Sequence, residues 1–261
     1  MSRHARDAGG DPELLAAKAE LRDEMWSRLD VDGVRRFPGP RNRIPNFVGA
    51  EAAAERLRAT SAWNGSVALK ANPDSPQWPV RQRALEDGKI VFMAVPRLAE
   101  PEPFFLLDPD HLADGPRRAS SIAGAARSAR TVALDEVTPV ELVLTGCVAV
   151  SEDGTRLGKG GGFSDLELAI ATEAGLVDAA TRVATTVHAR QLLPAGAIPS
   201  APHDLHVDLI ATPDGVLEVP RGDRPPARLA WDQLTEDKIA AIPLLGRLRI
   251  LHGSPDGSSG A

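Results

Sequence analysis

A glycine-rich stretch in the second half of the chain has the composition of an anion-binding loop. Residues 153–165 read Asp-Gly-Thr-Arg-Leu-Gly-Lys-Gly-Gly-Gly-Phe-Ser-Asp. Its central glycines are Gly158, Gly160, Gly161 and Gly162. Glycines let the backbone come close to an anion and present several N–H groups at once, and Arg156 and Lys159 add positive charges. We therefore predict that the stretch binds phosphate, rather than forming an ordinary flexible turn.

The position of this stretch between two predicted elements supports the same interpretation. A strand is predicted to end near Val150 and a helix to begin near Ser164, so the positive end of the helix would face the loop. Asp165 is a candidate Mg²⁺ ligand, because a carboxylate can hold the ion beside phosphate oxygens. The stretch is not a P-loop, which ends in Gly-Lys-Ser/Thr. It is not a dinucleotide fingerprint either, since the acidic residue expected about 20 positions later is absent.

Two other sets of cations are candidates for contact with an anion. Lys18 and Arg22 are four residues apart on a predicted helix, so they share one face and could grip a triphosphate. Their pattern alone favours a solvated face. A second set, in a proline-rich loop, consists of Arg35, Arg36, Arg41 and Arg43. That loop could meet RNA or a polyanionic tail, but a solvated loop is the simpler interpretation.

The remaining reactive side chains are expected to have structural roles. A short segment carries His203, Asp204, His206 and Asp208. No Cys or second His-rich segment completes a metal-ligand set, so these residues are expected to order a loop. Cys147 lies in an apolar run, which is typical of a small buried hydrophobic residue.

Predicted strands and helices alternate along most of the chain. Helices are expected at 12–30, 49–60, 79–87 and 164–174, and a mostly helical segment interrupted by Pro243 at 231–248. Strands are expected at 66–70, 89–95, 104–107, 182–188, 207–212 and 216–219, and a pair of strands at 142–150. The alternation predicts a mainly parallel sheet with helices on both faces. A ligand would then bind beyond the carboxyl ends of the strands.

We predict a single domain over residues 12–252, with a C-terminal helical extension at 228–250. Disorder is expected at 1–11 and 253–261, and a linker at Pro225-Pro226.

Composition and charge exclude several classes of function. The chain has 261 residues, of which 43% are hydrophobic and 25% charged, as in ordinary globular proteins. Its net charge of −6 argues against a nucleic-acid partner. No apolar segment approaches the ~18 residues of a membrane span, and the first residues lack the apolar core of a signal peptide. One cysteine fits a reducing, cytoplasmic location. The sequence leaves the oligomeric state open.

Several motifs, taken in order, resemble the 5-formyltetrahydrofolate cyclo-ligase family, also called methenyltetrahydrofolate synthetases. Residues 153–165 resemble the family's signature, and Lys18 and Arg22 its N-terminal pair of cations. The C-terminal pattern of the family is matched by residues 191–194, 202–204 and 208–213. A divergent branch, the methenyltetrahydrofolate synthetase domain-containing proteins, is more similar still, through residues 44–47, 70–77, 80–81 and 160–167 and, near the C-terminal end, through Trp231 and Ile242-Pro243.

This resemblance implies an α/β three-layer sandwich with a mainly parallel central sheet, similar to the sugar-phosphate isomerase and CoA-transferase group. It also implies an ATP- and Mg²⁺-dependent ligase. In that reaction ATP phosphorylates the formyl oxygen of 5-formyltetrahydrofolate, N10 attacks the activated carbon, and phosphate leaves as the ring closes. ATP would be bound by Lys18, Arg22, Arg156, Lys159 and the backbone of Gly158, Gly160, Gly161 and Gly162. Arg156 and Lys159 would take part in catalysis, and Asp165 would hold Mg²⁺.

The resemblance changes in the part of the motif that would face the folate. The family's signature ends in Gly-Tyr-Tyr-Asp, whereas residues 162–165 read Gly-Phe-Ser-Asp, so that Phe163 keeps one ring. Asp74 is the candidate for the family's acidic pterin reader, and Trp63 or Trp78 could supply a stacking surface. Two alternatives stay open: an ATP-dependent enzyme acting on a different acid or amide, and a non-catalytic nucleotide-binding or RNA-associated protein.

Overall fold

The computed structural model describes residues 11–222 and 227–251. Disorder is predicted for residues 1–11 and 253–261 and a linker at Pro225-Pro226; of these, residues 1–10, 253–261 and the linker lie outside the described residues. The prediction is wrong for Asp11, whose carboxylate caps the first helix. Within the described part of the chain, no helix combines the length and the apolar character that a membrane span requires.

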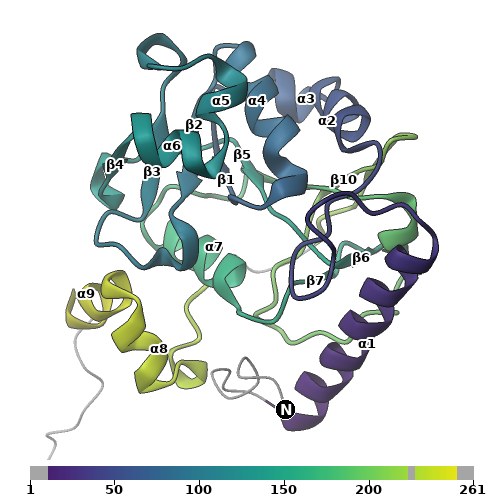
Figure 1. Cartoon of the computed structure of the whole chain (residues 1–261). Helices are drawn as coiled ribbons and strands as arrows, with labels where there is room; N and C mark the ends of the chain where they lie inside the picture. The colour runs from purple at the N-terminus through teal and green to yellow at the C-terminus, as the bar shows by residue number, and fades with distance from the viewer. Residues whose placement is uncertain (1–10, 223–226, 252–261) are drawn as a thin grey trace, which may run out of the picture.

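A mixed sheet forms the centre of the molecule (Figure 1). Over the described residues its eight strands follow the spatial order β11 (Val216–Glu218), β10 (Leu209–Ala211), β8 (Arg182–Thr186), β5 (Leu142–Leu144), β1 (Ala68–Ala71), β2 (Ile90–Ala94), β3 (Phe104–Leu107) and β4 (Arg130–Val132). Neighbouring strands from β10 to β2 are parallel. The pairs at the two edges are antiparallel. The predicted mainly parallel sheet is confirmed.

Side chains that alternate along the strands give this sheet two apolar faces. In β1, Leu69 and Ala71 belong to the apolar cluster on one face and Ala68 to the cluster on the other. In β2, Met93 belongs to the first of these clusters and Phe92 to the second. Strands of this kind are buried on both sides and need a layer of helices over each face.

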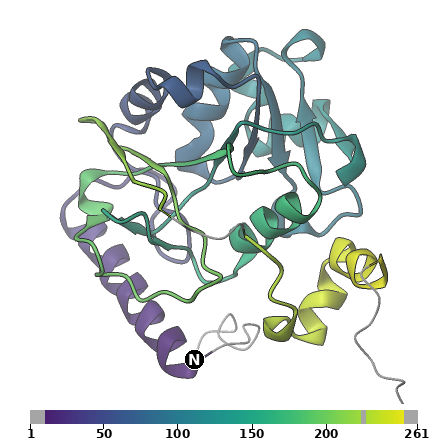
Figure 2. The same ribbon diagram turned by 180° about the vertical axis from the view of Figure 1, so that it is seen from behind.

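Helices cover both faces, which confirms the predicted three layers (Figures 1 and 2). On one face, the helices that join a common apolar cluster are α2 (Ala50–Arg58), α3 (Ser61–Asn64), α4 (Trp78–Glu86), α5 (Pro116–Ala119) and α6 (Ile122–Ser128). The other face carries α7 (Phe163–Glu173), which packs on the sheet through Leu168 and Ala171. Gly175, with a φ of 72°, follows the end of α7 as predicted, because a left-handed residue there favours glycine.

A small second sheet, which the sequence did not predict, lies beside the large one. It has the order β7 (Arg156–Leu157), β6 (Ala149–Ser151) and β9 (Leu192–Leu193). The strand pair predicted at 142–150 is therefore wrong as a pair, because β5 and β6 belong to different sheets. The first helix, α1 (Pro12–Val31), packs on the small sheet through Met25 and Trp26. As predicted, Asp11 caps it by accepting a hydrogen bond from Glu13 N at 2.9 Å.

The C-terminal extension covers the outer side of α7. Its helices are α8 (Glu236–Ala241) and α9 (Pro243–Leu251), preceded by the short 3₁₀ turn η7 (Trp231–Gln233), and Pro243 separates them as predicted. The residues of the extension that pack on α7 are Leu229, Ile242, Leu244, Leu245 and Leu248. α7 is thus held between the sheet and the extension. The other 3₁₀ turns are η2 (Ser75–Gln77), η3 (Pro96–Leu98), η4 (Pro109–His111), η5 (Leu134–Glu136) and η6 (Ala189–Gln191).

Candidate functional site

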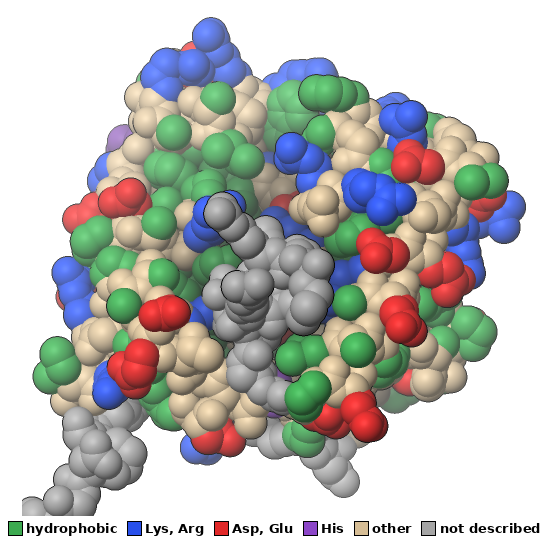
Figure 3. Space-filling view, turned by 60° about the horizontal axis from the view of Figure 1, so that its bottom comes forward, with side chains coloured by type: hydrophobic (Ala, Val, Ile, Leu, Met, Phe, Trp, Pro, Cys, Tyr) green, Lys and Arg blue, Asp and Glu red, His purple; other side chains and the backbone are tan. Residues whose placement is uncertain are grey.

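A pocket beside the first turn of α7 brings the predicted site residues together. Its lining includes every one of them: Lys18, Arg22, Asp74, Arg156, Gly158, Lys159, Gly160, Gly161, Gly162, Phe163 and Asp165. Seen from this side of the molecule, Lys and Arg side chains gather around the middle of the face (Figure 3). Residues that are far apart in the sequence therefore share one cationic surface.

The glycine loop runs from the end of β7 to the start of α7. Gly160 has a φ of 104° and Gly162 a φ of 67°, values in the left-handed region that favours glycine. At Gly161, a Cβ atom would lie 2.8 Å from the Phe163 ring, so a larger residue would force that ring to move. These positions explain why three consecutive glycines are needed: each serves a backbone turn or a close approach.

Arg156 is the most enclosed cation of the pocket. Its side chain is 3% exposed, and its Nη1 donates to Gly146 O at 2.8 Å while its Nη2 donates to Asp165 Oδ2 at 3.0 Å. Its Nε is buried and has no hydrogen-bond partner among the described residues. Burial alone would lower the pKa of Arg156, but the Asp165 carboxylate raises the pKa above its ordinary value. The guanidinium is therefore a fixed positive charge.

Asp165 uses both carboxylate oxygens within the protein. Oδ2 accepts from Arg156, and Oδ1 accepts from Leu205 N at 3.0 Å. Burial would raise the pKa of Asp165, but Arg156 and the Leu205 N–H lower it below its ordinary value. No group of three or more His, Cys, Asp and Glu side chains among the described residues could hold a metal ion. Asp165 orients Arg156, and its predicted role as a Mg²⁺ ligand stays a prediction.

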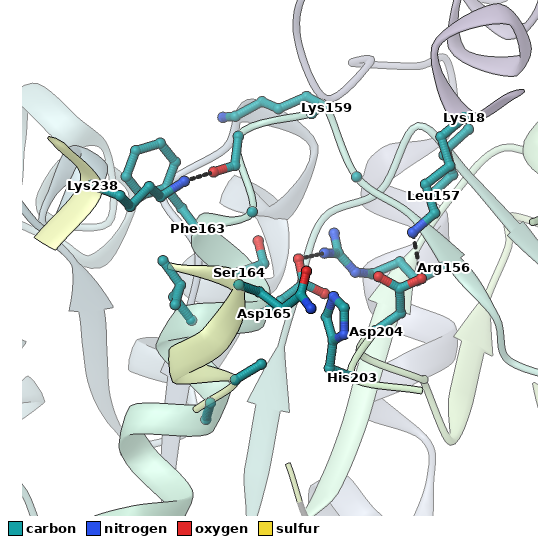
Figure 4. Close-up of a pocket in the computed structure, with 18 of the residues that line it drawn as sticks. Lys18, Arg156, Leu157, Lys159, Phe163, Ser164, Asp165, His203, Asp204 and Lys238 are labelled. Carbon is teal, nitrogen blue, oxygen red and sulfur yellow. Dashed lines mark hydrogen bonds and ion pairs between the residues drawn. The ribbon is translucent and has the colours of Figure 1, made fainter. Parts of the chain in front are cut away.

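Helix α1 turns Lys18 and Arg22 toward the pocket, so the interpretation of this face as solvated is wrong. Lys18 is 8% exposed and its Nζ forms an ion pair with Asp204. Arg22 Nε donates to Gly158 O at 2.7 Å. Burial, followed by the nearby charge of Arg156, lowers the pKa of Arg22. Figure 4 shows the Lys18–Asp204 pair on the side of the pocket away from Phe163.

Lys159 and Asp74 form a more exposed ion pair at the edge of the pocket. Their Nζ and Oδ1 atoms are 2.8 Å apart, and the Lys159 side chain is 42% exposed. Asp74 lies in the segment between β1 and η2 and lines the pocket, and its predicted role as the pterin reader stays a prediction.

Phe163 and Lys238 form a contact that sequence reasoning missed. Lys238 Nζ on α8 donates to Gly161 O and lies 4.6 Å from the centroid of the Phe163 ring. Figure 4 shows the two side chains together, across the pocket from Lys18. Other residues of the extension line the same pocket: Leu229, Ala230, Gln233 and Leu234. Trp231 and Ile242-Pro243 resemble the divergent branch of the family, but that resemblance does not indicate that the extension lines the pocket.

A second missed feature is a buried polar cluster on the α7 side of the sheet. The Lys70 ammonium of β1 forms an ion pair with Glu167 of α7, and both side chains are 4% exposed. Asn72 Nδ2 donates to the same carboxylate oxygen at 2.8 Å. Lys70 faces α7 because its neighbours Leu69 and Ala71 face the opposite layer. The cluster fixes α7, and with it the glycine loop, against β1.

Several other candidates have different surroundings from those expected. Neither tryptophan proposed as a stacking surface lines the pocket: Trp63 is buried and donates to Asp87 Oδ2 at 2.9 Å, and Trp78 donates to Arg117 O at 3.0 Å. The arginine-rich loop forms ion pairs with acidic residues, among them Arg36 with Glu51 at 2.7 Å.

The expected loop-ordering role is confirmed for Asp204, which accepts from Lys18 and from Ala201 N. Cys147 is buried as expected, and burial raises the pKa of its thiol to about 11.

Comparison with known proteins identifies similar chains. Residues 13–213 match the model of the 5-formyltetrahydrofolate cyclo-ligase family. The methenyltetrahydrofolate synthase domain-containing protein of Bos taurus is 36% identical over 245 residues, which cover 92% of this chain and 63% of that protein. The protein of the same name from Mus musculus is 36% identical over 239 residues, covering 89% and 63%. The chain thus spans less than two thirds of the length of these relatives.

A solved structure shares the fold. The NMR structure of 5,10-methenyltetrahydrofolate synthetase from Aquifex aeolicus superposes with a TM-score of 0.51 at 19% identity, covering 82% of this chain and 97% of that chain. The matched family segment ends before the C-terminal extension begins.

Proposed function

Since the chain belongs to the 5-formyltetrahydrofolate cyclo-ligase family, we propose that it is an ATP-dependent ligase that converts 5-formyltetrahydrofolate into 5,10-methenyltetrahydrofolate. ATP would bind with its phosphates on the glycine loop. The folate-like substrate would approach from the side of Phe163 and Asp74, the two candidate substrate-binding residues.

The convergence of separate segments on one loop carries this proposal. The described lining of the pocket has six cationic side chains, Lys18, Arg22, Arg156, Lys159, Arg228 and Lys238, and three carboxylates, Asp74, Asp165 and Asp204. The excess of positive charge suits a triphosphate. The first turn of α7 adds the positive end of its dipole.

The proposed reaction asks the protein to position two substrates and to stabilise charge. The γ-phosphoryl group passes from ATP to the formyl oxygen, breaking the bond to the β-phosphate oxygen and releasing ADP. N10 then attacks the formyl carbon, the carbon–oxygen bond breaks as phosphate leaves, and the N10 proton is lost to solvent. Arg156, fixed by Asp165, would stabilise the negative charge of the phosphoryl group during its transfer. Lys159, whose side chain is more exposed, would stay in contact with the phosphoryl group as it moves from ATP to the formyl oxygen.

The residues present do not form a magnesium site made by protein alone. Asp165 already accepts hydrogen bonds at both oxygens, and the described residues contain no cluster of three or more His, Cys, Asp and Glu side chains that could hold a metal ion. A magnesium ion would therefore be bound chiefly by the phosphates and by water, as is usual for this ion. We assign Asp165 to the positioning of Arg156, and no step of the reaction depends on a protein-held metal.

One observation favours a second candidate function, an ATP-dependent ligase for a different acid or amide. The ring of Phe163 lies under the Lys238 ammonium. A pterin would need an exposed aromatic face for stacking, whereas the ammonium lies over one face of this ring. A non-catalytic or RNA-associated role has less support, because arginines of the basic loop are paired with carboxylates.

The proposal is tested by a direct assay. The purified chain is incubated with ATP, Mg²⁺ and 5-formyltetrahydrofolate, and the absorbance of 5,10-methenyltetrahydrofolate is followed. We expect turnover that is lost in Arg156→Ala together with ATP binding. ATP binding without turnover would exclude this substrate and favour the second candidate. Binding of RNA at physiological salt, without turnover, would favour the RNA-associated alternative. We also propose that the chain is cytoplasmic and that residues 12–252 form a single domain.

A further inference from the structure

Two carbonyl oxygens of the glycine loop accept hydrogen bonds from cations that come from opposite ends of the chain. Arg22 Nε on α1 donates to Gly158 O at 2.7 Å, at the start of the loop. Lys238 Nζ on α8 donates to Gly161 O, near the end of the loop. Both cations line the pocket. Each therefore fixes one peptide of the loop while its charge stays at the surface where an anion would bind.

Lys238 is placed at the start of α7. A Cβ atom added to Gly162, the N-cap of α7, would be 3.7 Å from Lys238 Nζ. The same ammonium lies over the Phe163 ring at 4.6 Å. An anion at the first turn of a helix is attracted by the helix dipole and by unpaired N–H groups. Lys238 adds a full charge at this point, and Figure 4 shows it facing the pocket across from Lys18 and Arg156.

The extension holds Lys238 in place through an apolar contact of its own. Ile242, Leu244 and Leu245 pack against α7, and Leu229 N donates to Glu173 Oε1 at 2.9 Å. Thr235 caps α8 by accepting from Lys238 N at 3.2 Å, which fixes the backbone from which the side chain starts. The position of the ammonium thus depends on packing outside residues 13–213, the segment that matches the family model.

We propose that Lys238 is the counterpart of Arg22: it binds the terminal phosphates of ATP, and the C-terminal extension completes the nucleotide site. This inference rests on the proposed ATP binding and adds a ligand residue from outside the matched family segment. The extension is then part of the binding site, in addition to being a cover for α7.

The test compares nucleotides that differ in their phosphates. Dissociation constants of ATP and AMP are measured by calorimetry for the unaltered chain and for Lys238→Met, which keeps the length of the side chain and removes its charge. We expect Lys238→Met to weaken ATP binding about tenfold to a hundredfold, the range of a charge-assisted hydrogen bond. AMP, which lacks the terminal phosphates, should lose less than about threefold.

Two further variants separate ligand binding from a structural role. Lys238→Arg should restore most of the ATP affinity. Arg247→Met removes a positive charge from an exposed position of the same extension, away from the pocket, and should leave both affinities unchanged. Equal weakening of ATP and AMP in Lys238→Met, with a lower melting temperature, would show that Lys238 only shapes the loop and would overturn the inference. Unchanged affinities would overturn it as well. Failure of the unaltered chain to bind ATP would instead reject the proposed function and this inference together.

Discussion

Two lysine–carboxylate pairs close to β1 occupy opposite environments. Lys70 and Glu167 are both 4% exposed, between the sheet and α7. Lys159 and Asp74 are 42% and 15% exposed, at the edge of the pocket. Removing one member of a buried pair leaves an uncompensated charge in the interior, whereas an exposed pair can exchange its partner at little cost. The first pair therefore builds the framework, and the second, in the proposed function, provides a charge for the ligand.

The buried pair should produce the largest effect on stability. Glu167→Ala leaves the Lys70 ammonium without its carboxylate, so we expect the free energy of unfolding to fall by about 3–5 kcal/mol. Urea denaturation measures the change. Replacing both members, as Lys70→Met with Glu167→Leu, is the matched control and should recover most of the loss, because no unpaired charge remains. If Glu167→Ala lowers the free energy of unfolding by less than about 1 kcal/mol, the buried pair contributes no more to stability than an exposed pair does.

Arg156 tests the intermediate case, a buried cation that faces the ligand. Arg156→Lys keeps the charge but cannot donate to Gly146 O and Asp165 Oδ2 from one planar group. We expect ATP affinity to fall by about 1.5–3 kcal/mol, as measured by calorimetry. Arg83→Lys changes a half-buried arginine on α4 outside the pocket; it serves as the control and should bind ATP normally. Normal ATP binding by Arg156→Lys would show that charge alone matters at this position.

The exposed pair should affect binding more than stability. Lys159→Ala should change the free energy of unfolding by no more than about 1 kcal/mol and weaken ATP binding by up to about tenfold. The partner variant Asp74→Asn releases Lys159, so ATP should bind equally well or more tightly. If Asp74 also reads the second substrate, the KM for 5-formyltetrahydrofolate should rise in Asp74→Asn while ATP affinity is kept. A large loss of stability in either variant would contradict the assignment of this pair to the ligand.

The smallest expected effect concerns Cys147, which lies in the framework between β5 and β6. At about pH 8, almost none of a buried thiol with a pKa of about 11 is ionised, so iodoacetamide should not modify the native chain. Labelling followed by mass spectrometry should therefore report only unfolding, and should be faster in Glu167→Ala. Rapid labelling of the native chain would show that the framework opens locally.

The sequence predicted those parts of the molecule that have a local signal. Alternating elements indicated the three layers, and three glycines beside Arg156 and Lys159 indicated the loop. The two-residue strand β7 was missed because it is too short to show a period. Lys70 was missed because a charged residue inside a strand says nothing about its partner, which is 97 positions away. Lys238 was missed because its position depends on how α8 packs on α7, and no local pattern encodes that contact.

The pocket also has a consequence for how the chain is made. Its walls include Leu15 on α1 and Lys238 on α8, which are synthesised at very different times. At about 5–20 residues per second, the second wall leaves the ribosome roughly 10–45 s after the first. A nascent chain that has completed its sheet would still lack the α8 side of the site. Nucleotide capture would thus follow the synthesis of α8, and ATP would bind chains that include α8 in preference to shorter precursors.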